Sequence, residues 1–219
     1  MHSAVIFDWD GTLVDSRDMN IESFQKVLTD IGVSVDDAFI EKRIGIGPKN
    51  IFRDIFKAKS IPFDEALLTE LQKKKIVIQL AQTGRVAMLE GAEDLLESLQ
   101  GRLKMALATM SNREVINKLL REKGLGRYFD VVITVDEVEK PKPDPEIFVK
   151  SASRLGFPPK MCVVMEDSIF GVLAAKEADM SCVAVATGAY SAEDLARYDP
   201  DLLIRSLREK DAILRFLFG

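Results

Sequence analysis

Two aspartates follow the first apolar segment of the chain, and their spacing is the first sign of chemistry. The stretch FDWDGTLVD spans residues 7–15 and places Asp8 and Asp10 two positions apart. Neighbouring carboxylates can take different acid, base and nucleophile roles when their surroundings separate their pKa values. They also repel each other where the effective dielectric constant is low, and a bound cation relieves that repulsion. The pair therefore indicates a catalytic or metal-binding site.

Further polar residues come directly after later apolar runs. They are Thr109, Met110 and Ser111 after 105–108, Asp136 and the stretch Lys140-Pro-Lys142-Pro after 131–134, and Glu166 and Asp167 after 162–165. Ligands of parallel sheets bind outside the carboxyl ends of the strands, so these residues are expected to gather at one edge. An all-oxygen ligand set with few protein ligands is typical of Mg²⁺, which keeps waters and meets phosphate.

The shortage of histidine excludes several other chemistries. The only histidine is His2, at the terminus, so Ser-His-Asp catalysis, Cys-His catalysis and His-rich zinc sites lack a central residue. Cys162 and Cys182 each lie within an apolar run, and two such residues are too few for a disulfide framework. We expect both to be buried, reduced thiols.

The elements that position these residues follow from the apolar pattern. Six short continuous runs are predicted to be strands buried on both faces: Ala4–Phe7, Met105–Ala108, Val131–Thr134, Cys162–Met165, Cys182–Ala186 and Leu202–Ile204. Helical patterns separate the later runs, among them 148–155 and 169–178. Ser111 to Glu114 has the pattern of a capping box, opening a helix that ends at Gly124. Alternating strands and helices predict an α/β fold with a parallel sheet covered by helices on both faces.

Nearly a hundred residues between the first two strand runs contain helical patterns instead. One apolar stripe runs from Ile21 to Ile31, a second from Ile51 to Phe56, and a third includes Leu67, Leu68, Leu71, Ile76 and Leu80. A structureless connection of this length is uncommon. We therefore predict a helical unit over 16–84, inserted into a sheet-containing unit formed by 1–15 and 85–219. Asp15 or Ser16 is expected to cap its first helix.

Composition limits the partners. The 219 residues include 47% hydrophobic and 30% charged residues, with a formal net charge of −5, which favours a packed globular protein over a disordered one. No basic stripe indicates nucleic-acid binding, and no apolar run approaches the roughly 18 residues of a membrane span. A strand-like run begins almost at once, which leaves no room for a signal peptide. We expect a cytoplasmic protein, a monomer or weak dimer, with no nucleic-acid or membrane partner.

Four motifs in order resemble the haloacid dehalogenase superfamily of phosphohydrolases, in the subgroup with a helical cap after the first motif. DWDGTLVDS (8–16) resembles its DxDGT motif and ALAT (106–109) its strand ending in Thr or Ser. KPDPEIF (142–148) resembles its Lys-Pro-x-Pro motif, and VVMEDSIFGVLAA (163–175) its acidic pair opening a helix. The match covers essentially the whole chain. It implies a Rossmann-like core domain with the cap at 16–84.

The resemblance also implies roles for the acidic residues. Asp8 would be the nucleophile that forms an aspartyl-phosphate, and Asp10 the acid for the leaving oxygen and then the base that activates water. Mg²⁺ would be held by Asp8, by the backbone carbonyl of Asp10 and by Asp167. Glu166 would be either a direct ligand or a group that orients metal-bound waters.

The remaining expected site residues bind phosphate or substrate. Thr109 would donate its hydroxyl to a phosphoryl oxygen beside the Met110 backbone N–H, and Lys142 would reach both the phosphate and Asp8. Lys140 competes for that role, but the Pro-x-Pro pattern follows Lys142. The cap would set specificity, with Asn20 and Lys49 as candidate contacts; solvated surface positions are the alternative for both.

The implied activity is Mg²⁺-dependent hydrolysis of a small phosphorylated metabolite, with phosphoglycolate-type phosphatases as the nearest named group. Dehalogenases of the superfamily lack the second acid, so Asp10 speaks against that chemistry. Sugar phosphomutases of the β-phosphoglucomutase type carry a His where this chain has Asn20, yet they stay open as an alternative. So does a phospho-aspartate switch or binding module, because receiver domains also combine acids, Mg²⁺, Thr and Lys.

Trp9 is the only tryptophan and separates the two aspartates. It could fill the floor beneath the loop or narrow the pocket. We predict packing, because Trp is more often a buried anchor than a substrate contact.

Overall fold

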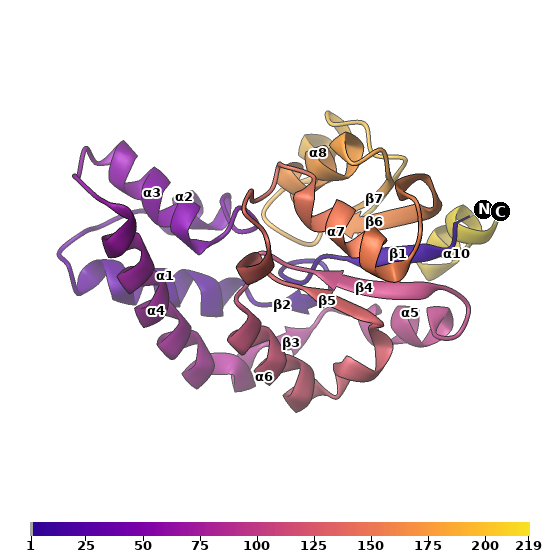
Figure 1. The fold of residues 1–219 in the computed structure, drawn as a ribbon, viewed down its shortest axis with the longest axis horizontal. Coiled ribbons are helices and arrows are strands. Elements are labelled where there is room, and N and C mark those ends of the chain that lie inside the picture. The colour runs from indigo at the N-terminus through magenta and orange to yellow at the C-terminus, as the bar shows by residue number, and fades with distance from the viewer. Residues whose placement is uncertain (1) are drawn as a thin grey trace.

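A six-stranded, fully parallel sheet forms the centre of the larger unit in the computed structural model, which describes residues 2–219 (Figure 1). The strand order is β5-β4-β1-β6-β7-β8. The strands are β1 (Ala4–Phe7), β4 (Lys104–Ala108), β5 (Val131–Ile133), β6 (Cys162–Glu166), β7 (Ser181–Val185) and β8 (Leu202–Ile204). All six predicted runs form strands, and their ends differ from the predictions by at most one residue. The predicted α/β class is therefore confirmed.

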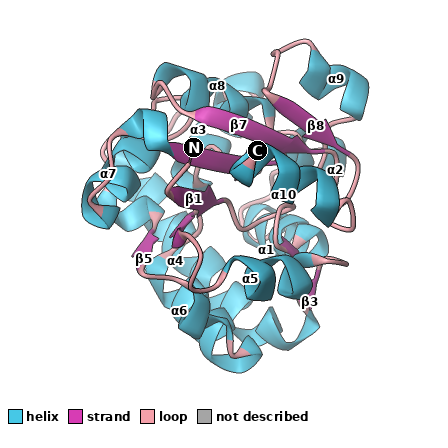
Figure 2. Ribbon diagram, turned by 90° about the vertical axis from the view of Figure 1, so that its right-hand side faces the viewer, coloured by secondary structure: helices cyan, strands magenta, loops and turns pink. Residues whose placement is uncertain are grey.

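Helices cover both faces of this sheet, which is why its strands are continuously apolar. They are α5 (Ala92–Leu99), α6 (Arg113–Lys123), α7 (Glu146–Leu155), α8 (Ile169–Glu177), α9 (Ala192–Ala196) and α10 (Lys210–Phe218). In β1, Val5 and Phe7 pack with α5, α6 and α10, whereas Ala4 and Ile6 pack with α7, α8 and α9. Figure 2 shows the sheet between α8 and α9 on one side and α5 and α6 on the other. Both cysteines are buried and free, as predicted.

A separate set of helices lies beside the carboxyl ends of the strands, at the left of Figure 1. They are α1 (Arg17–Thr29), α2 (Asp37–Glu41), α3 (Pro48–Ala58) and α4 (Glu65–Gln82). Phe24, Phe52 and Ile55 belong to an apolar core that these helices share among themselves. None of the helices in residues 2–219 is both long and apolar enough to cross a membrane.

Two short strands mark where the chain passes between the sheet and these four helices. β2 (Val14–Asp15) pairs antiparallel with β3 (Ala87–Met88), so the outgoing and returning segments lie side by side. We call α1–α4 the cap and the sheet with its covering helices the core. The boundaries of the cap at residues 16 and 84 stay a prediction, and the paired crossing segments lie just outside them.

The predicted capping box at 111–114 is wrong. Asn112 is the N-cap residue of α6, and its side chain makes no capping hydrogen bond. The side chain of Asp136, from the segment after β5, accepts the Arg113 N–H at 2.6 Å and the Asn112 amide at 3.0 Å. Because Asp136 accepts the N–H at the start of α6, the Ser111 hydroxyl is not needed as a cap and can bind Asp10 instead.

Candidate active site

The turn after β1 is closed by its own backbone. The carbonyl of Trp9 accepts the N–H groups of Thr12, Leu13 and Val14 at 3.0–3.3 Å, which folds the chain back on itself. Gly11 adopts a φ of +81°, a left-handed conformation that side chains disfavour. Trp9 is fully buried on the same face as Phe7, so its predicted packing role is confirmed. The side chains of Phe7 and Trp9 thus face the same apolar core, while those of Asp8 and Asp10 point to the site.

Lys142 joins two of the carboxylates. Its Nζ lies 2.6 Å from Asp8 Oδ1 and 2.5 Å from Glu166 Oε1, and it also donates to the Ala108 carbonyl at 3.4 Å. The Lys142 side chain is completely buried, which is rare for lysine without charged partners. This ion pair network connects the ends of β1, β4 and β6 to the segment before α7.

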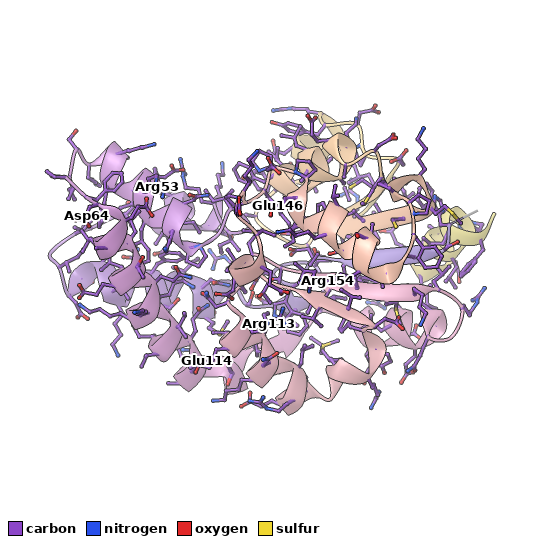
Figure 3. The ribbon with its side chains drawn as sticks, viewed as in Figure 1. Arg53, Asp64, Arg113, Glu114, Glu146 and Arg154 are labelled. Carbon is purple, nitrogen blue, oxygen red and sulfur yellow. The ribbon has the colours of Figure 1, made fainter. Side chains whose placement is uncertain are left out.

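Glu146, labelled in Figure 3, holds the backbone that carries Lys142. Its carboxylate accepts the N–H groups of Glu139 and Lys140 at 2.7–3.1 Å, and its ion pair with Lys150 comes first among the causes that lower its pKa to about 2. Lys140 itself is exposed and lies 3.9 Å from Asp144. The structure thus brings Lys142, and not Lys140, to Asp8.

Glu166 and Asp167 complete the acidic cluster. Glu166 Oε2 accepts three hydrogen bonds, from the Asp167 N–H, the Ser168 N–H and the Ser168 hydroxyl, at 2.9–3.1 Å. Asp167 Oδ1 accepts the Thr12 hydroxyl at 3.1 Å. A Cβ added at Gly11 or Gly188 would lie 2.4 or 1.7 Å from Asp167 Oδ2, so only glycine leaves room for this carboxylate. Both acids are consequently fixed in place.

Burial and mutual repulsion raise the pKa of two of these acids. The pKa of Asp8 is raised well above its ordinary value, first by burial, against the lowering effect of Lys142, with further raising by Glu166 and Asp10. The pKa of Asp167 is raised by burial, then by Glu166 and Asp8. For Lys142, burial lowers the pKa, but the two anionic partners outweigh it and raise the pKa overall. One ammonium group therefore does not neutralise the cluster.

The donor set of this cluster fits a hard divalent cation. One carboxylate oxygen from each of Asp8, Glu166 and Asp167 can be chosen so that all three lie within 4.8 Å of one another. Sulfur and imidazole ligands are absent from the cluster, which favours Mg²⁺ over softer metals. Both oxygens of Glu166 are already engaged with other donors, whereas Asp167 Oδ2 has no hydrogen-bond donor in residues 2–219.

Asp10 lies between the core and the cap, and both supply donors to it. Oδ1 accepts the Ser16 hydroxyl at 2.5 Å and the Asn20 amide at 3.0 Å, both from the cap side. Oδ2 accepts the Ser111 hydroxyl at 2.7 Å and lies 3.5 Å from the Thr109 hydroxyl, both on the core side. Ser16 does occupy the N-cap position of α1, but its side chain makes no capping bond because it is turned to Asp10. Of the two residues predicted to cap α1, Ser16 does not do so, whereas the Asp15 carboxylate accepts the Arg17 N–H at 3.3 Å.

Cavities separate the candidate substrate contacts. A space of about 20 Å³ is lined by Asp10, Asn20 and Met110, among others from both units. Lys49 instead lines a cleft of about 390 Å³ with Arg53. The walls of this cleft include Asp136 but none of Asp8, Asp10, Glu166, Asp167 and Lys142. Asp136, expected at the site, is exposed and bonded to the start of α6. The structure thus brings Asn20 and Met110 to Asp10 but not Lys49 or Asp136.

Sequence reasoning missed several polar neighbours of the site. Ser111 was visible at the end of a predicted strand, yet its position before Glu114 favoured a helix cap. Lys75 lies within a run of three lysines, which is typical of an exposed face. In the structure, α4 buries Leu68, Leu71, Lys75 and Gln79. These four positions follow helical spacing, but a polar pair on a buried stripe is recognised only when its partner on another helix is known.

Comparison with known proteins places this geometry in a family. Residues 5–185 match the model of the haloacid dehalogenase-like hydrolases. The chain is 31% identical to validoxylamine A 7′-phosphate phosphatase of Streptomyces hygroscopicus subsp. limoneus, over 95% of this chain and 96% of that protein. It is also 31% identical to the fructose-1-phosphate phosphatase YqaB of Escherichia coli, over 84% of this chain and 96% of that one.

Solved structures share the fold over the whole length. A hydrolase from Pseudomonas syringae superposes with a TM-score of 0.91 at 24% identity and covers all of both chains. A β-phosphoglucomutase from Clostridium difficile gives 0.85 at 25% identity, over 99% of this chain and 100% of that one. The chain therefore belongs to the haloacid dehalogenase-like hydrolases and is an enzyme of the phosphoric monoester hydrolase class.

Proposed function

We propose that this protein hydrolyses a small phosphorylated metabolite with Mg²⁺, through an aspartyl-phosphate on Asp8. The observation that carries the proposal is the buried network in which Lys142 bridges Asp8 and Glu166. One carboxylate oxygen of Asp167 lies within 4.8 Å of an oxygen of each of these two acids, close enough for the three to share one metal ion. An ammonium and a cation beside a carboxylate prepare the site for the negative charge that phosphoryl transfer concentrates there.

In the first step, a carboxylate oxygen of Asp8 attacks phosphorus as the bond to the ester oxygen breaks. Asp10 gives its proton to that leaving oxygen, so the leaving group departs as a neutral alcohol. Lys142 balances the charge on Asp8 and on the transferred phosphoryl group. The Thr109 hydroxyl, which accepts the Ser111 N–H at 3.0 Å, is the proposed donor to a phosphoryl oxygen.

In the second step, Asp10 acts as a base. It takes a proton from a water molecule whose oxygen attacks the phosphorus of the aspartyl-phosphate, and the bond between phosphorus and the Asp8 oxygen breaks. Phosphate leaves, and Asp8 is regenerated as a carboxylate. Two steps with one acid–base residue require Asp10 to be held firmly, and the hydrogen bonds from Ser16, Asn20 and Ser111 support that requirement.

Mg²⁺ would be held by Asp8, Asp167 and the backbone carbonyl of Asp10, and it supplies positive charge for the phosphoryl oxygens. Glu166 is proposed to support this site rather than to ligate the ion, because both its oxygens already accept hydrogen bonds. Its bond to Lys142 keeps that ammonium beside Asp8. The raised pKa values of Asp8 and Asp167 agree with a cluster that a cation would stabilise.

Two spaces beside Asp10 limit the size of the substrate. One of about 20 Å³ is lined by polar groups, among them Asn20 and Lys75, and by apolar residues such as Phe24 and Met110. The other, of about 140 Å³, is also lined by Asp167. The curated relatives named above act on phosphorylated sugar-like compounds according to their names, and a Thermotoga maritima relative, 31% identical, is named a phosphorylated carbohydrates phosphatase. We therefore propose sugar and polyol phosphates as the first compounds to test.

The decisive experiment compares wild-type protein with Asp8→Asn on a panel of phosphorylated metabolites with and without Mg²⁺. We expect phosphate release that needs both Asp8 and the metal, and trapping of the label from a ³²P substrate on the wild-type chain only. An Asp8→Asn protein that still hydrolysed the best substrate would refute the aspartyl-phosphate mechanism.

A phosphomutase is the second candidate, because the β-phosphoglucomutase neighbour covers nearly the same chain length. In this protein, Asn20 occupies the cap position expected to carry a His in those enzymes, and an amide cannot exchange a proton as an imidazole does. Incubation with a hexose 1-phosphate separates the two, since a mutase yields the 6-phosphate and a phosphatase yields free phosphate.

A further inference from the structure

Lys75 is a buried cation that the proposed mechanism leaves without a role. It lies in α4, is 2% exposed, and has no carboxylate within ion-pair distance in residues 2–219. Burial lowers its pKa to about 7, against a raising effect of Asp10. Its ammonium lies 4.6 Å from the centre of the Phe24 ring. An unpaired buried ammonium is costly, so its position calls for a specific contact.

That contact is the side chain of Asn20. Lys75 Nζ donates to Asn20 Oδ1 at 3.2 Å, and Gln79 Nε2, one helical turn later, donates to the same oxygen at 3.1 Å. On the other side of the amide, Asn20 Nδ2 donates to Asp10 Oδ1 at 3.0 Å. A continuous chain of hydrogen bonds thus runs from α4 through α1 to the proposed acid.

The two donors on α4 favour one orientation of the Asn20 amide. If the amide were turned over, its NH₂ would meet the NH groups of Lys75 and Gln79, and its oxygen would meet the Asp10 carboxylate. Both contacts would be repulsive. Lys75 and Gln79 therefore reinforce the orientation in which Asn20 presents its NH₂ to Asp10 and, at 3.2 Å, to the Ser16 carbonyl.

We infer that Lys75 and Gln79 are positioning residues for the acid–base step, acting on Asp10 through Asn20. On the core side, the Ser111 hydroxyl holds one oxygen of Asp10 at 2.7 Å. The other oxygen is held from the cap side by the Ser16 hydroxyl at 2.5 Å and by Asn20 at 3.0 Å. When the Asn20 bond is lost, only Ser16 holds that oxygen, so the carboxyl group rotates more readily about its last torsion and delivers its proton to the leaving oxygen less often. The inference rests on the proposed function and extends it to α4.

This role has a consequence that depends on the leaving group. An alkoxide is a poor leaving group and needs the proton from Asp10, whereas p-nitrophenolate departs readily without one. Loss of the positioning contact should therefore slow the first step, release of the leaving group, much more for an alkyl phosphate than for p-nitrophenyl phosphate, whereas the second step is the same for both. A purely structural defect in the cap would slow the first step of both esters alike.

The test measures the single-turnover rate of leaving-group release, kcat and KM for Lys75→Met and Gln79→Leu with Mg²⁺, using p-nitrophenyl phosphate and the best alkyl phosphate of wild-type protein. We expect the single-turnover rate of alcohol release from the alkyl phosphate to fall about 10- to 100-fold with little change in KM, and that of p-nitrophenolate release to change less than about threefold. Lys73→Met, two positions away and exposed, is the matched control. In an Asn20→Leu background, Lys75→Met should add nothing, because both act through one contact.

Three results would overturn the inference. Equal losses in the single-turnover rate of leaving-group release from both esters in Lys75→Met and Gln79→Leu would indicate a structural role. A rise in KM at unchanged kcat would mean that Lys75 contacts substrate directly. Full additivity with Asn20→Leu would break the proposed connection. Failure of the proposed function has a different signature, since wild-type turnover itself would then be independent of Asp8.

Discussion

At the scale of single residues, Lys142 has the least freedom to change. It is the only cation bonded to the three-carboxylate cluster in residues 2–219, and its side chain is fully buried. Its charge serves stability and chemistry together, because removal of one partner of a buried ion pair leaves uncompensated charge. A methionine keeps the length of the side chain and removes only the charge.

We expect Lys142→Met to lower kcat by about 100-fold or more, the magnitude typical of a lost electrostatic contact in a transition state. The free energy of unfolding should also fall, by about 3–5 kcal/mol in the absence of metal. Steady-state kinetics and urea denaturation measure the two effects. Lys140→Met, two positions earlier and exposed, should change neither, and a comparable loss there would contradict the assignment of Lys142.

Lys75 gives a prediction for stability against pH. Its pKa in the folded protein is lowered to about 7, so between that value and its ordinary range the unfolded chain binds more protons than the folded one. The penalty of burying the ammonium is fully present below about pH 7 and disappears as the pH rises toward 10. Asp10 is the charged group that faces it; Asn20, Gln79 and Phe24 are its uncharged neighbours.

Lys75→Met should therefore unfold at higher urea concentration than wild type at about pH 6, and this advantage should shrink by about pH 9. The difference at low pH is expected to be of the order of a few kcal/mol. Lys73→Met, which removes an exposed charge on the same helix, provides the reference. An advantage that does not change with pH would show that the Lys75 side chain is not buried as a charged group.

At the scale of elements, the first turn of α8 is shaped by the acid that precedes it. Gly171 lies so close to Glu166 that an added Cβ would fall 1.8 Å from the carboxyl carbon. The Gly171 N–H also donates to the Ser168 hydroxyl at 3.0 Å, which caps the helix. The close approach of helix and strand end thus fixes the Glu166 side chain that holds Lys142.

Gly171→Ala should destabilise the protein by about 1–3 kcal/mol, the cost of overpacking, although alanine favours helix by up to about 1 kcal/mol. We also expect kcat to fall, because the added methyl group would displace the Glu166 side chain that holds Lys142. Thermal unfolding and kcat measure both. Gly84→Ala, at a glycine with open space around its Cβ position, controls for the backbone effect. A stabilised, fully active Gly171→Ala protein would contradict the close packing.

At the scale of the whole molecule, core and cap meet through few polar contacts outside the site. The hydroxyl of Tyr190, in the segment after β7, donates to the Lys42 carbonyl at the end of α2 at 2.6 Å. Burial raises the Tyr190 pKa to about 12, so the hydroxyl keeps its proton over the working pH range. Gly45 of the cap also comes close to Ser168, next to the acidic pair.

Tyr190→Phe should favour a more open arrangement of cap and core by about 1 kcal/mol, the value of one hydrogen bond. The expected result is a KM about fivefold higher with thermal stability nearly unchanged. Tyr198→Phe, whose hydroxyl makes no hydrogen bond in residues 2–219, is the matched control. An unchanged KM in Tyr190→Phe would show that this contact does not hold the cap in place.

The sequence by itself determined the elements and the residues most strongly tied to chemistry. Short, continuous apolar runs with β-branched residues are typical of strands buried on both faces, so all six strands were predictable. The polar residues that follow the runs could likewise be assigned to the carboxyl ends of the strands. Asp8, Asp10, Glu166, Asp167 and Lys142 could be singled out because charged groups beside buried strands need a reason. Local pattern carries that information directly.

Only the tertiary structure decided which polar groups serve one another. Ser111 and Ser16 had the sequence context of helix caps, yet both hydroxyls bind Asp10, while Asp136 caps α6 from a different segment. Lys75 looked exposed until α1 brought Asn20 to it. A hydrogen bond depends on the meeting of two groups that lie far apart along the chain, and the side-chain pattern of either segment alone does not contain the position of its partner.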